Sequence, residues 1–351
     1  MFLRVKITFY FVVLFIFITM FAGCKREVVV EEHEERTDIL RIYVYESFAN
    51  SAFLDHVTEL FAEMYDCTVE LVALNDDARL LGQIVAERDY LRADLVLGIT
   101  NLELHRAIAS NLFVPYEVAS LRNVRDRNLI IDERFRLIPY DFAYFAFVYD
   151  NERIYDPPST FGEFQSSVWH DRLIMLDPRT SATGHGLLMW IMGIYGERGY
   201  EVYWDRVRRN IYTVYNSHEQ AYIDFLTDIA PMLFSYNTTL ARLNETVRPG
   251  RYGAFIPLEG GFTEISYAGI LEGAPNIFLA RRFIDFMLTR EIQTLLPVMH
   301  WRYPVISGIE LPESFDELPV PQNNLTESIH ARTALFSDIW IDTWIRIMGL
   351  E

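Results

Sequence analysis

Short apolar segments alternate with longer amphipathic segments in the first third of the chain. Residues 42–45, 69–74 and 93–98 are short and rich in apolar side chains, which is typical of buried strands. Between them, residues 52–65 and 78–88 repeat apolar side chains at helical spacing. This β-α-β-α order predicts a mainly parallel sheet that binds its ligands at the carboxyl ends of the strands.

The first of these helices is expected to bury one apolar face. Its side chains on that face are Phe53, Val57, Leu60, Phe61 and Met64. The tips after the three strands are residues 46–47, 75–77 and 99–101. Because an open α/β sheet holds its ligands at such strand ends, we expect contacts at these loops.

Two longer strands are expected at residues 142–149 and 262–270, more than a hundred residues apart. One long strand before and one after a segment of more than a hundred residues indicate that the chain passes twice between two lobes. The lobes would be joined by these paired strands, with a ligand cleft between them. The length of the chain also exceeds the usual size of one core. We therefore predict an α/β protein in which each lobe is a mainly parallel sheet flanked by helices. The expected bounds are residues 39–141 and 271–310 for lobe 1, and residues 142–270 and 311–351 for lobe 2.

Residues 1–24 have the layout of a bacterial lipoprotein export signal. Two basic residues precede an apolar run, and Phe21, Ala22 and Gly23 lead directly to Cys24. Small residues before a cysteine suit a lipoprotein signal peptidase and lipidation of Cys24. Phe21 stands where such signals usually have leucine. The alternative is an uncleaved membrane helix, since the apolar run is near the lower limit for spanning a bilayer.

An acidic segment, residues 25–38, is too charged to pack a core and is expected to be a tether between lipid and domain. Residues 1–24 hold two basic residues and no acid, so their removal leaves 29 basic residues against 49 acidic ones, a formal charge of −20. A nucleic-acid partner is therefore not expected. Most of the acids are expected to form a solvated surface, and a few can favour a cationic ligand.

Cys67 is the one cysteine besides Cys24, so we expect neither an internal disulfide nor a cysteine-based metal site. It begins a strand-like alternation and is expected to be a buried, inert thiol. The sequence has no nucleophile elbow, zinc-protease helix or phosphate-binding glycine loop, and Gly-His-Gly at residues 184–186 lacks the third glycine of a dinucleotide loop. We therefore expect no cofactor, no metal and no catalytic residue.

Aromatic residues lie near expected loops: Tyr45 ends a strand, Tyr236 follows one, and Trp301 and Tyr303 are in a turn-like segment. Each can simply pack in a core. Their shared position at strand ends and turns also favours an aromatic cage around a ligand.

A hydroxyl-rich segment, residues 177–184, leads into an apolar helical stretch. Thr180 and Ser181 would then lie at the N-terminus of a helix. Such hydroxyls cap the helix, and together with free amides they can also hold an anion such as phosphate. The sequence leaves both roles open.

Six short segments carry a further signal. They are Tyr-Val-Tyr-Glu-Ser-Phe (43–48), Leu-Val-Ala-Leu (71–74), Ala-Asp-Leu-Val-Leu-Gly (93–98), Tyr-Phe-Ala-Phe-Val-Tyr-Asp (144–150), Asp-Pro-Arg-Thr-Ser (177–181) and Trp-Arg-Tyr-Pro-Val (301–305). In this order the chain resembles the thiamine-binding proteins of bacterial ABC importers, over roughly residues 39–320. The resemblance implies a type II periplasmic-binding-protein fold that closes on thiamine or a thiamine phosphate and delivers it to permease and ATPase subunits.

The resemblance also implies roles for single residues. Tyr45 and Trp301 match cage positions that sandwich the rings of the vitamin, and Tyr236 matches a cleft tyrosine. Thr180 and Ser181 match hydroxyls on the phosphate side. The chemistry agrees, because a thiazolium cation gains from aromatic faces and a nearby carboxylate.

Three positions depart from the pattern of that family. Glu46 stands where aspartate is usual, which keeps the charge. His218 replaces a tryptophan and Arg242 replaces a tyrosine, so one stacking ring is lost and a cation is gained. This favours a phosphorylated form or a related pyrimidine over free thiamine. Alternatively, Arg242 points to solvent and pairs with one of the many surface acids, such as Glu245.

The sequence therefore predicts a lipid-anchored, monomeric substrate-binding subunit of an importer, located outside the cytoplasm and without chemistry of its own. A polyamine or another small cation is an alternative ligand, because acidic and aromatic clefts suit such cations as well. From another class, an exported enzyme or a sensor could reuse the same fold.

Overall fold

The computed structural model describes residues 38–74, 80–333 and 337–350. The expected export signal, with Cys24, and almost all of the expected tether lie outside these residues. The polar segment expected at residues 75–77 also lies outside them. No helix in the described ranges is long and apolar enough to cross a membrane.

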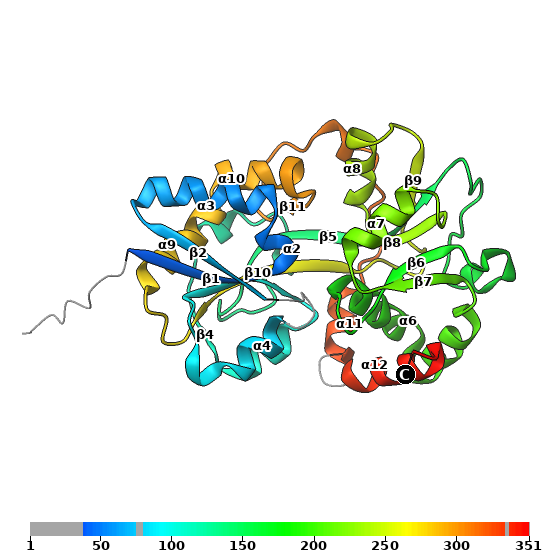
Figure 1. The fold of residues 1–351 in the computed structure, drawn as a ribbon, viewed down its shortest axis with the longest axis horizontal. Coiled ribbons are helices and arrows are strands. Elements are labelled where there is room, and N and C mark those ends of the chain that lie inside the picture. Colours follow the sequence, from blue (N-terminus) through cyan, green and yellow to red (C-terminus); the bar gives the residue numbers. More distant parts are fainter. Residues whose placement is uncertain (1–37, 75–79, 334–336, 351) are drawn as a thin grey trace, which may run out of the picture. The chain divides into compact units, whose positions relative to one another are not determined.

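Eleven strands of the described chain form one sheet, in the central order β2-β1-β3-β10-β5-β8-β6-β7 (Figure 1). The strands are β1 (Ile39–Tyr45), β2 (Thr68–Leu74), β3 (Leu95–Thr100), β4 (Phe113–Val114), β5 (Ile138–Asp150), β6 (Leu173–Leu176), β7 (Ile211–Tyr215), β8 (Met232–Tyr236), β9 (Tyr252–Phe255), β10 (Thr263–Leu271) and β11 (Tyr303–Pro304). Pairs β1·β2, β1·β3, β6·β7 and β6·β8 are parallel. The α/β class expected from the sequence is confirmed.

Strand β5 joins the two halves of the sheet. Its first part pairs antiparallel with β10 and β11, and its second part pairs with β8 and β9. The β5·β10 register sets Asp141 opposite Ser266 and Ala143 opposite Glu264. Strands β5 and β10 run side by side between the two halves (Figure 1). The expected lobe boundaries at 141/142 and 270/271 fall inside these two strands.

Helices cover both halves of the sheet (Figure 1). They are α2 (Glu46–Ala49), α3 (Ala52–Tyr65), α4 (Leu80–Ala86), α5 (Leu104–Ser110), α6 (Ala182–Val207), α7 (His218–Leu226), α8 (Thr238–Thr246), α9 (Ile277–Met287), α10 (Arg290–Leu295), α11 (Thr326–Thr333) and α12 (Ser337–Met348). Shorter 3-10 turns are Arg88–Tyr90, Ala119–Asn123, Arg127–Leu129, Glu163–Gln165, Ser167–Trp169 and Glu313–Phe315, and Leu296–His300 is a π-helical turn.

Helix α3 has the bounds expected from the sequence, because Ser51 caps its first turn and Asp66 ends it in a left-handed conformation. On its apolar face Phe53, Val57 and Phe61 are buried and Leu60 is half-buried, whereas Met64 is 59% exposed and was wrongly expected inside. In that last turn Tyr65, not Met64, packs its ring against Phe61. The second expected helix is shorter than predicted, since α4 ends at Ala86.

Cys67 is half-buried, and the prediction of a fully buried thiol was wrong. It directly precedes β2, which lies at the edge of the sheet and has one side open to solvent. Partial burial still raises the pKa of the Cys67 thiol, which favours the protonated form over the thiolate.

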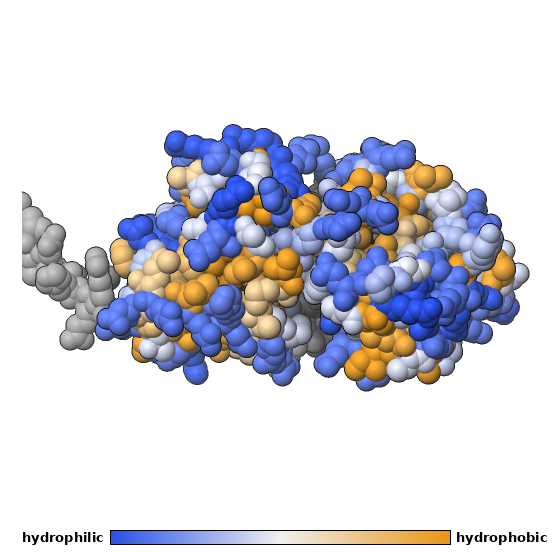
Figure 2. All heavy atoms as spheres, turned by 90° about the horizontal axis from the view of Figure 1, so that it is seen from above, coloured by the Kyte–Doolittle hydropathy of each residue, from blue (hydrophilic) through white to orange (hydrophobic). Residues whose placement is uncertain are grey.

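Two clusters of apolar side chains form the core. One packs Phe53, Phe61 and Phe283 against the β1 side of the sheet, and the other is built around Trp190 and Trp204 of α6. The C-terminal helices α11 and α12 pack along α6. Hydrophilic residues spread over both halves of the face in Figure 2, with smaller hydrophobic areas between them, as expected for an acidic, solvated surface.

Candidate functional site

A buried ionic cluster lies where β5 and β10 cross. Arg302, just before β11, donates from Nε to Asp141 Oδ1 (2.9 Å) and from Nη2 to Glu264 Oε1 (3.2 Å) and Ser266 Oγ (3.4 Å). Arg302, Asp141 and Glu264 are all buried. Alternation along the strands turns these carboxylates to the same face of the sheet, where one guanidinium reaches both.

The cluster contains two acids but one strong base. Among the described residues, Asp141 Oδ2 and Glu264 Oε2 are buried without a hydrogen-bond partner. Burial raises the pKa of Glu264, and the Arg302 guanidinium only partly opposes this rise. His300 Nε2 lies 3.8 Å from Asp141 Oδ2, but burial lowers the pKa of His300 to about 4. At neutral pH His300 is therefore uncharged and does not supply a second cation.

Tyr236 links this cluster to α6. Its hydroxyl donates to Glu264 Oε1 (2.9 Å) and lies 3.0 Å from Thr183 Oγ1. Arg302 Cζ lies 4.6 Å from the centroid of its ring, and Phe145 stacks on the ring at 5.4 Å. Tyr236 is therefore held in place both at its ring and at its hydroxyl.

Tyr45, at the end of β1, is linked to the cluster through stacked rings, and Trp301 directly precedes Arg302 in the chain. Tyr45 is half-buried, and its ring stacks on Phe48 at 5.5 Å. Phe48 in turn stacks on His300 at 4.7 Å. Trp301 follows His300, is half-buried and has a left-handed backbone (φ 56°).

The absence of a side chain at Gly98 leaves space for the ring of Tyr45. A Cβ at Gly98, whose φ is +100°, would lie 2.5 Å from Tyr45 Cε1. Only glycine fits there without strain. Glu46, the next residue along the chain, is exposed at the start of α2.

Thr180 and Ser181 precede α6 as expected. Ser181 Oγ accepts a hydrogen bond from the Thr183 amide, so the capping role is confirmed for Ser181. Thr180 Oγ1 is buried and has no hydrogen-bond partner in the part of the chain that the structure describes. The anion role of the two hydroxyls stays a prediction.

His218 and Arg242 form a second group, on α7 and α8. Arg242 is exposed, and its Cζ lies 4.4 Å from the centroid of the Tyr222 ring. Burial, and then the Arg242 charge, lower the pKa of His218 to about 4. The alternative pairing with Glu245 is not seen among the described residues, since Glu245 accepts from Ser314 Oγ instead.

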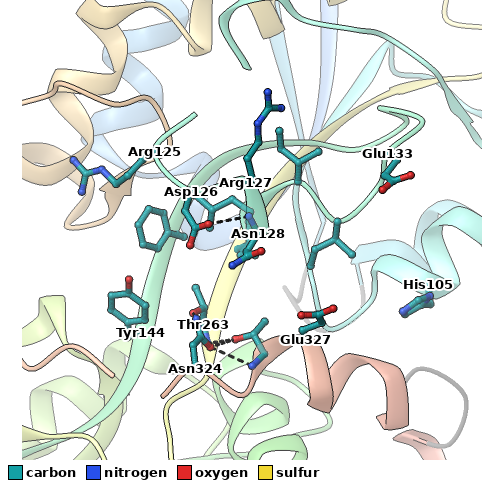
Figure 3. Close-up of a pocket in the computed structure, with 16 residues that line it drawn as sticks. His105, Arg125, Asp126, Arg127, Asn128, Glu133, Tyr144, Thr263, Asn324 and Glu327 are labelled. Carbon is teal, nitrogen blue, oxygen red and sulfur yellow. Dashed lines mark hydrogen bonds between the residues drawn. The ribbon is translucent and has the colours of Figure 1, made fainter. Parts of the chain in front are cut away.

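A cavity of about 720 Å³ lies on the other face of the crossing strands (Figure 3). Phe142, Tyr144, Thr263 and Ile265 line it. Along β5 and β10 these residues alternate with the positions on the Asp141 and Glu264 side, so their side chains point to the opposite face of the sheet. None of the ligand contacts expected from the sequence lines this cavity. The residues that sequence reasoning missed are Asp141, Glu264 and Arg302, and the available signal was an acid inside each of two otherwise apolar strands.

Comparison with known proteins matches the family model described as bacterial extracellular solute-binding protein to residues 93–324. The chain is 32% identical to the thiamine-binding periplasmic protein of Brucella abortus over 88% of this chain and 91% of that protein. It is also 32% identical to the one of Escherichia coli K12, over 89% and 94% of the two chains.

Solved structures give the same picture. A structure titled periplasmic thiamin binding protein superposes with a TM-score of 0.81 at 31% identity, covering 88% of this chain and 96% of that one. The ferric ion-binding protein A of Pasteurella haemolytica superposes with a TM-score of 0.75 at 13% identity, which supports the fold alone. The expected type II periplasmic-binding-protein fold is thus confirmed.

Proposed function

Because the chain belongs to the family of bacterial extracellular solute-binding proteins, we propose that it binds thiamine or a thiamine phosphate outside the cytoplasm and delivers it to the permease and ATPase of an ABC importer. The observation that carries this proposal is the excess of buried carboxylates at the crossing strands, next to Tyr45 and Trp301. A site with aromatic rings beside buried carboxylates suits a small aromatic cation. The protein acts as a monomer and carries out no reaction on the ligand.

Isothermal titration calorimetry with thiamine, its monophosphate, its diphosphate and spermidine tests this function. We expect saturable one-to-one binding of at least one thiamine form and none of spermidine, which lacks rings to stack on Tyr45 and Trp301. Tight binding of spermidine alone would make the protein a polyamine carrier. A turnover product in the titrated sample would instead indicate an enzyme.

Arg242 is expected to favour phosphorylated ligands. If it turns from Tyr222 toward the cleft, it can form a bidentate pair with a phosphate, and Thr180 Oγ1 can add a donor. Thiamine monophosphate should then bind more tightly than thiamine by about 1–3 kcal/mol. Arg242→Tyr should narrow that margin, whereas Arg208→Tyr, at an exposed arginine paired with Asp205, should not. An equal margin in wild type and Arg242→Tyr would remove Arg242 from the site.

Cys24 is proposed to carry the lipid anchor. The mature protein should then partition into detergent and carry acyl chains, because a lipidated cysteine holds an otherwise charged chain on a membrane. In Cys24→Ala the acyl mass should disappear from the intact-mass spectrum and the detergent phase should lose the protein. Unchanged membrane retention and an uncleaved N-terminus would point to a membrane helix instead.

A further inference from the structure

The charges around Glu264 do not balance. Its carboxylate faces Arg302 and Tyr236 directly, with Asp141 on the far side of the same guanidinium. His300, behind Asp141, is uncharged at neutral pH. Two buried carboxylates thus share one cation, and each retains an oxygen with no hydrogen-bond partner among the described residues. A buried excess charge of this kind is strongly unfavourable unless a cation or a proton neutralises it.

The residues expected to hold the ligand border this imbalance. Trp301 is the direct chain neighbour of Arg302. Tyr45 stacks on Phe48, and Phe48 stacks on His300, whose Nε2 lies 3.8 Å from Asp141 Oδ2. A cation held between Tyr45 and Trp301 would therefore lie close to both carboxylates in a low-dielectric interior, where its charge acts strongly.

We propose that Glu264 is the charge sensor of the cleft: it holds a proton while the cleft is empty and releases that proton to solvent when a ligand cation enters. This inference rests on the proposed function and extends it, because Glu264 would determine specificity by responding to the charge of the ligand. The excess carboxylate selects a permanent cation over a neutral molecule of the same shape. Binding of the cation and loss of the proton leave the total charge of the cluster unchanged.

The test compares thiamine, a permanent cation, with thiochrome, its neutral fused analogue. Calorimetry at matched pH in two buffers of different ionisation enthalpy counts the protons released, and affinities are measured from about pH 4.5 to 7.5. Wild type should release up to one proton with thiamine, and its thiamine affinity should rise by up to about tenfold per pH unit on the acid side. Thiochrome should release none. The aminopyrimidine of thiamine also titrates, but it contributes equally in every variant.

Glu264→Gln keeps the shape of the side chain and removes its titration. The variant should lose the part of the acid-side pH dependence and of the proton release that Glu264 supplies, and keep only the part that the aminopyrimidine contributes. At neutral pH its thiamine affinity should fall by about tenfold or more, while thiochrome affinity changes by less than about threefold. Glu133→Gln, which removes an exposed carboxylate on the opposite face of the crossing strands, should behave like wild type.

Other outcomes would overturn the inference. Equal weakening of both ligands in Glu264→Gln would make Glu264 a packing residue. Proton release that persists undiminished in Glu264→Gln would assign the proton to another group. If Glu264→Gln fails to fold, the two-buffer measurement on wild type still tests the proposal. Thiamine binding to wild type without any release of protons would refute the role of Glu264 as a charge sensor. Wild type that binds thiamine without preferring it over thiochrome refutes the sensor alone, whereas wild type that binds no thiamine refutes the proposed function and the sensor with it.

Discussion

Replacing Arg302 with methionine is expected to lower the free energy of unfolding by about 3–5 kcal/mol at neutral pH. Methionine fills much of the same volume, but it leaves Asp141 and Glu264 buried without their shared cation. Removing one partner of a buried ionic cluster is costly because the remaining charges cannot regain water. Urea denaturation followed by circular dichroism measures the change.

The loss should also depend on pH. The folded-state pKa of Glu264 is raised, so its protonated form contributes stability that is present below the unfolded pKa of 4.5 and is lost as pH rises through the folded pKa. The deficit of Arg302→Met should therefore shrink as pH falls toward about 4.5. Adding Glu264→Gln should recover little of it, because Glu264 is proposed to hold a proton already in the ligand-free protein and Asp141 keeps the uncompensated charge. Arg248→Met, at an exposed pair with Glu152, should change stability by less than about 1 kcal/mol. A similar small change in Arg302→Met would mean that the cluster adds little to stability.

Local patterns were enough to predict the elements around the site. Helix α3 was predictable because Ser51 begins it and a 3.6-residue apolar repeat continues through it. Strand β5 was predicted from its aromatic run, although it begins at Ile138, four residues earlier than expected. Those four residues include Asp141, which a pattern of apolar residues alone would exclude from a strand. The same polar residue turned out to be part of the ionic cluster.

The cluster itself could not be predicted from local pattern. Asp141, Glu264 and Arg302 lie on three segments far apart in the sequence, and only the β5·β10 and β5·β11 registers bring them together. Alternation within each strand shows which residues share a face, but not which strand lies alongside. The same limit applies to Arg242, which the sequence could pair with Glu245 one helical turn away. In the folded chain a different helix supplies its neighbour, the ring of Tyr222.

Replacing Trp301 with alanine is expected to weaken thiamine binding by about 2–4 kcal/mol, a larger effect than that of any other cage residue proposed here. An indole in a desolvated cleft contributes a large face to a ring cation, and alanine removes that face entirely. Tyr45→Ala should weaken binding by about 1–3 kcal/mol, because its ring is smaller and already stacks on Phe48. Calorimetric titration of the purified variants measures both effects.

Tyr45→Ala and Trp301→Ala should keep their fold. Retained stability with weakened binding would distinguish residues of a ligand cage from residues of the hydrophobic core. Tyr45 and Trp301 are half-buried, so alanine leaves no large internal cavity. Trp190→Ala, in the fully buried core around α6, should instead lower the free energy of unfolding by about 3–5 kcal/mol. Tyr155→Ala, at a side chain that is 99% exposed, should change neither stability nor binding. If Trp301→Ala loses cooperative unfolding as Trp190→Ala does, while its remaining folded fraction binds thiamine normally, then Trp301 is a core residue and the proposed cage lacks its main ring.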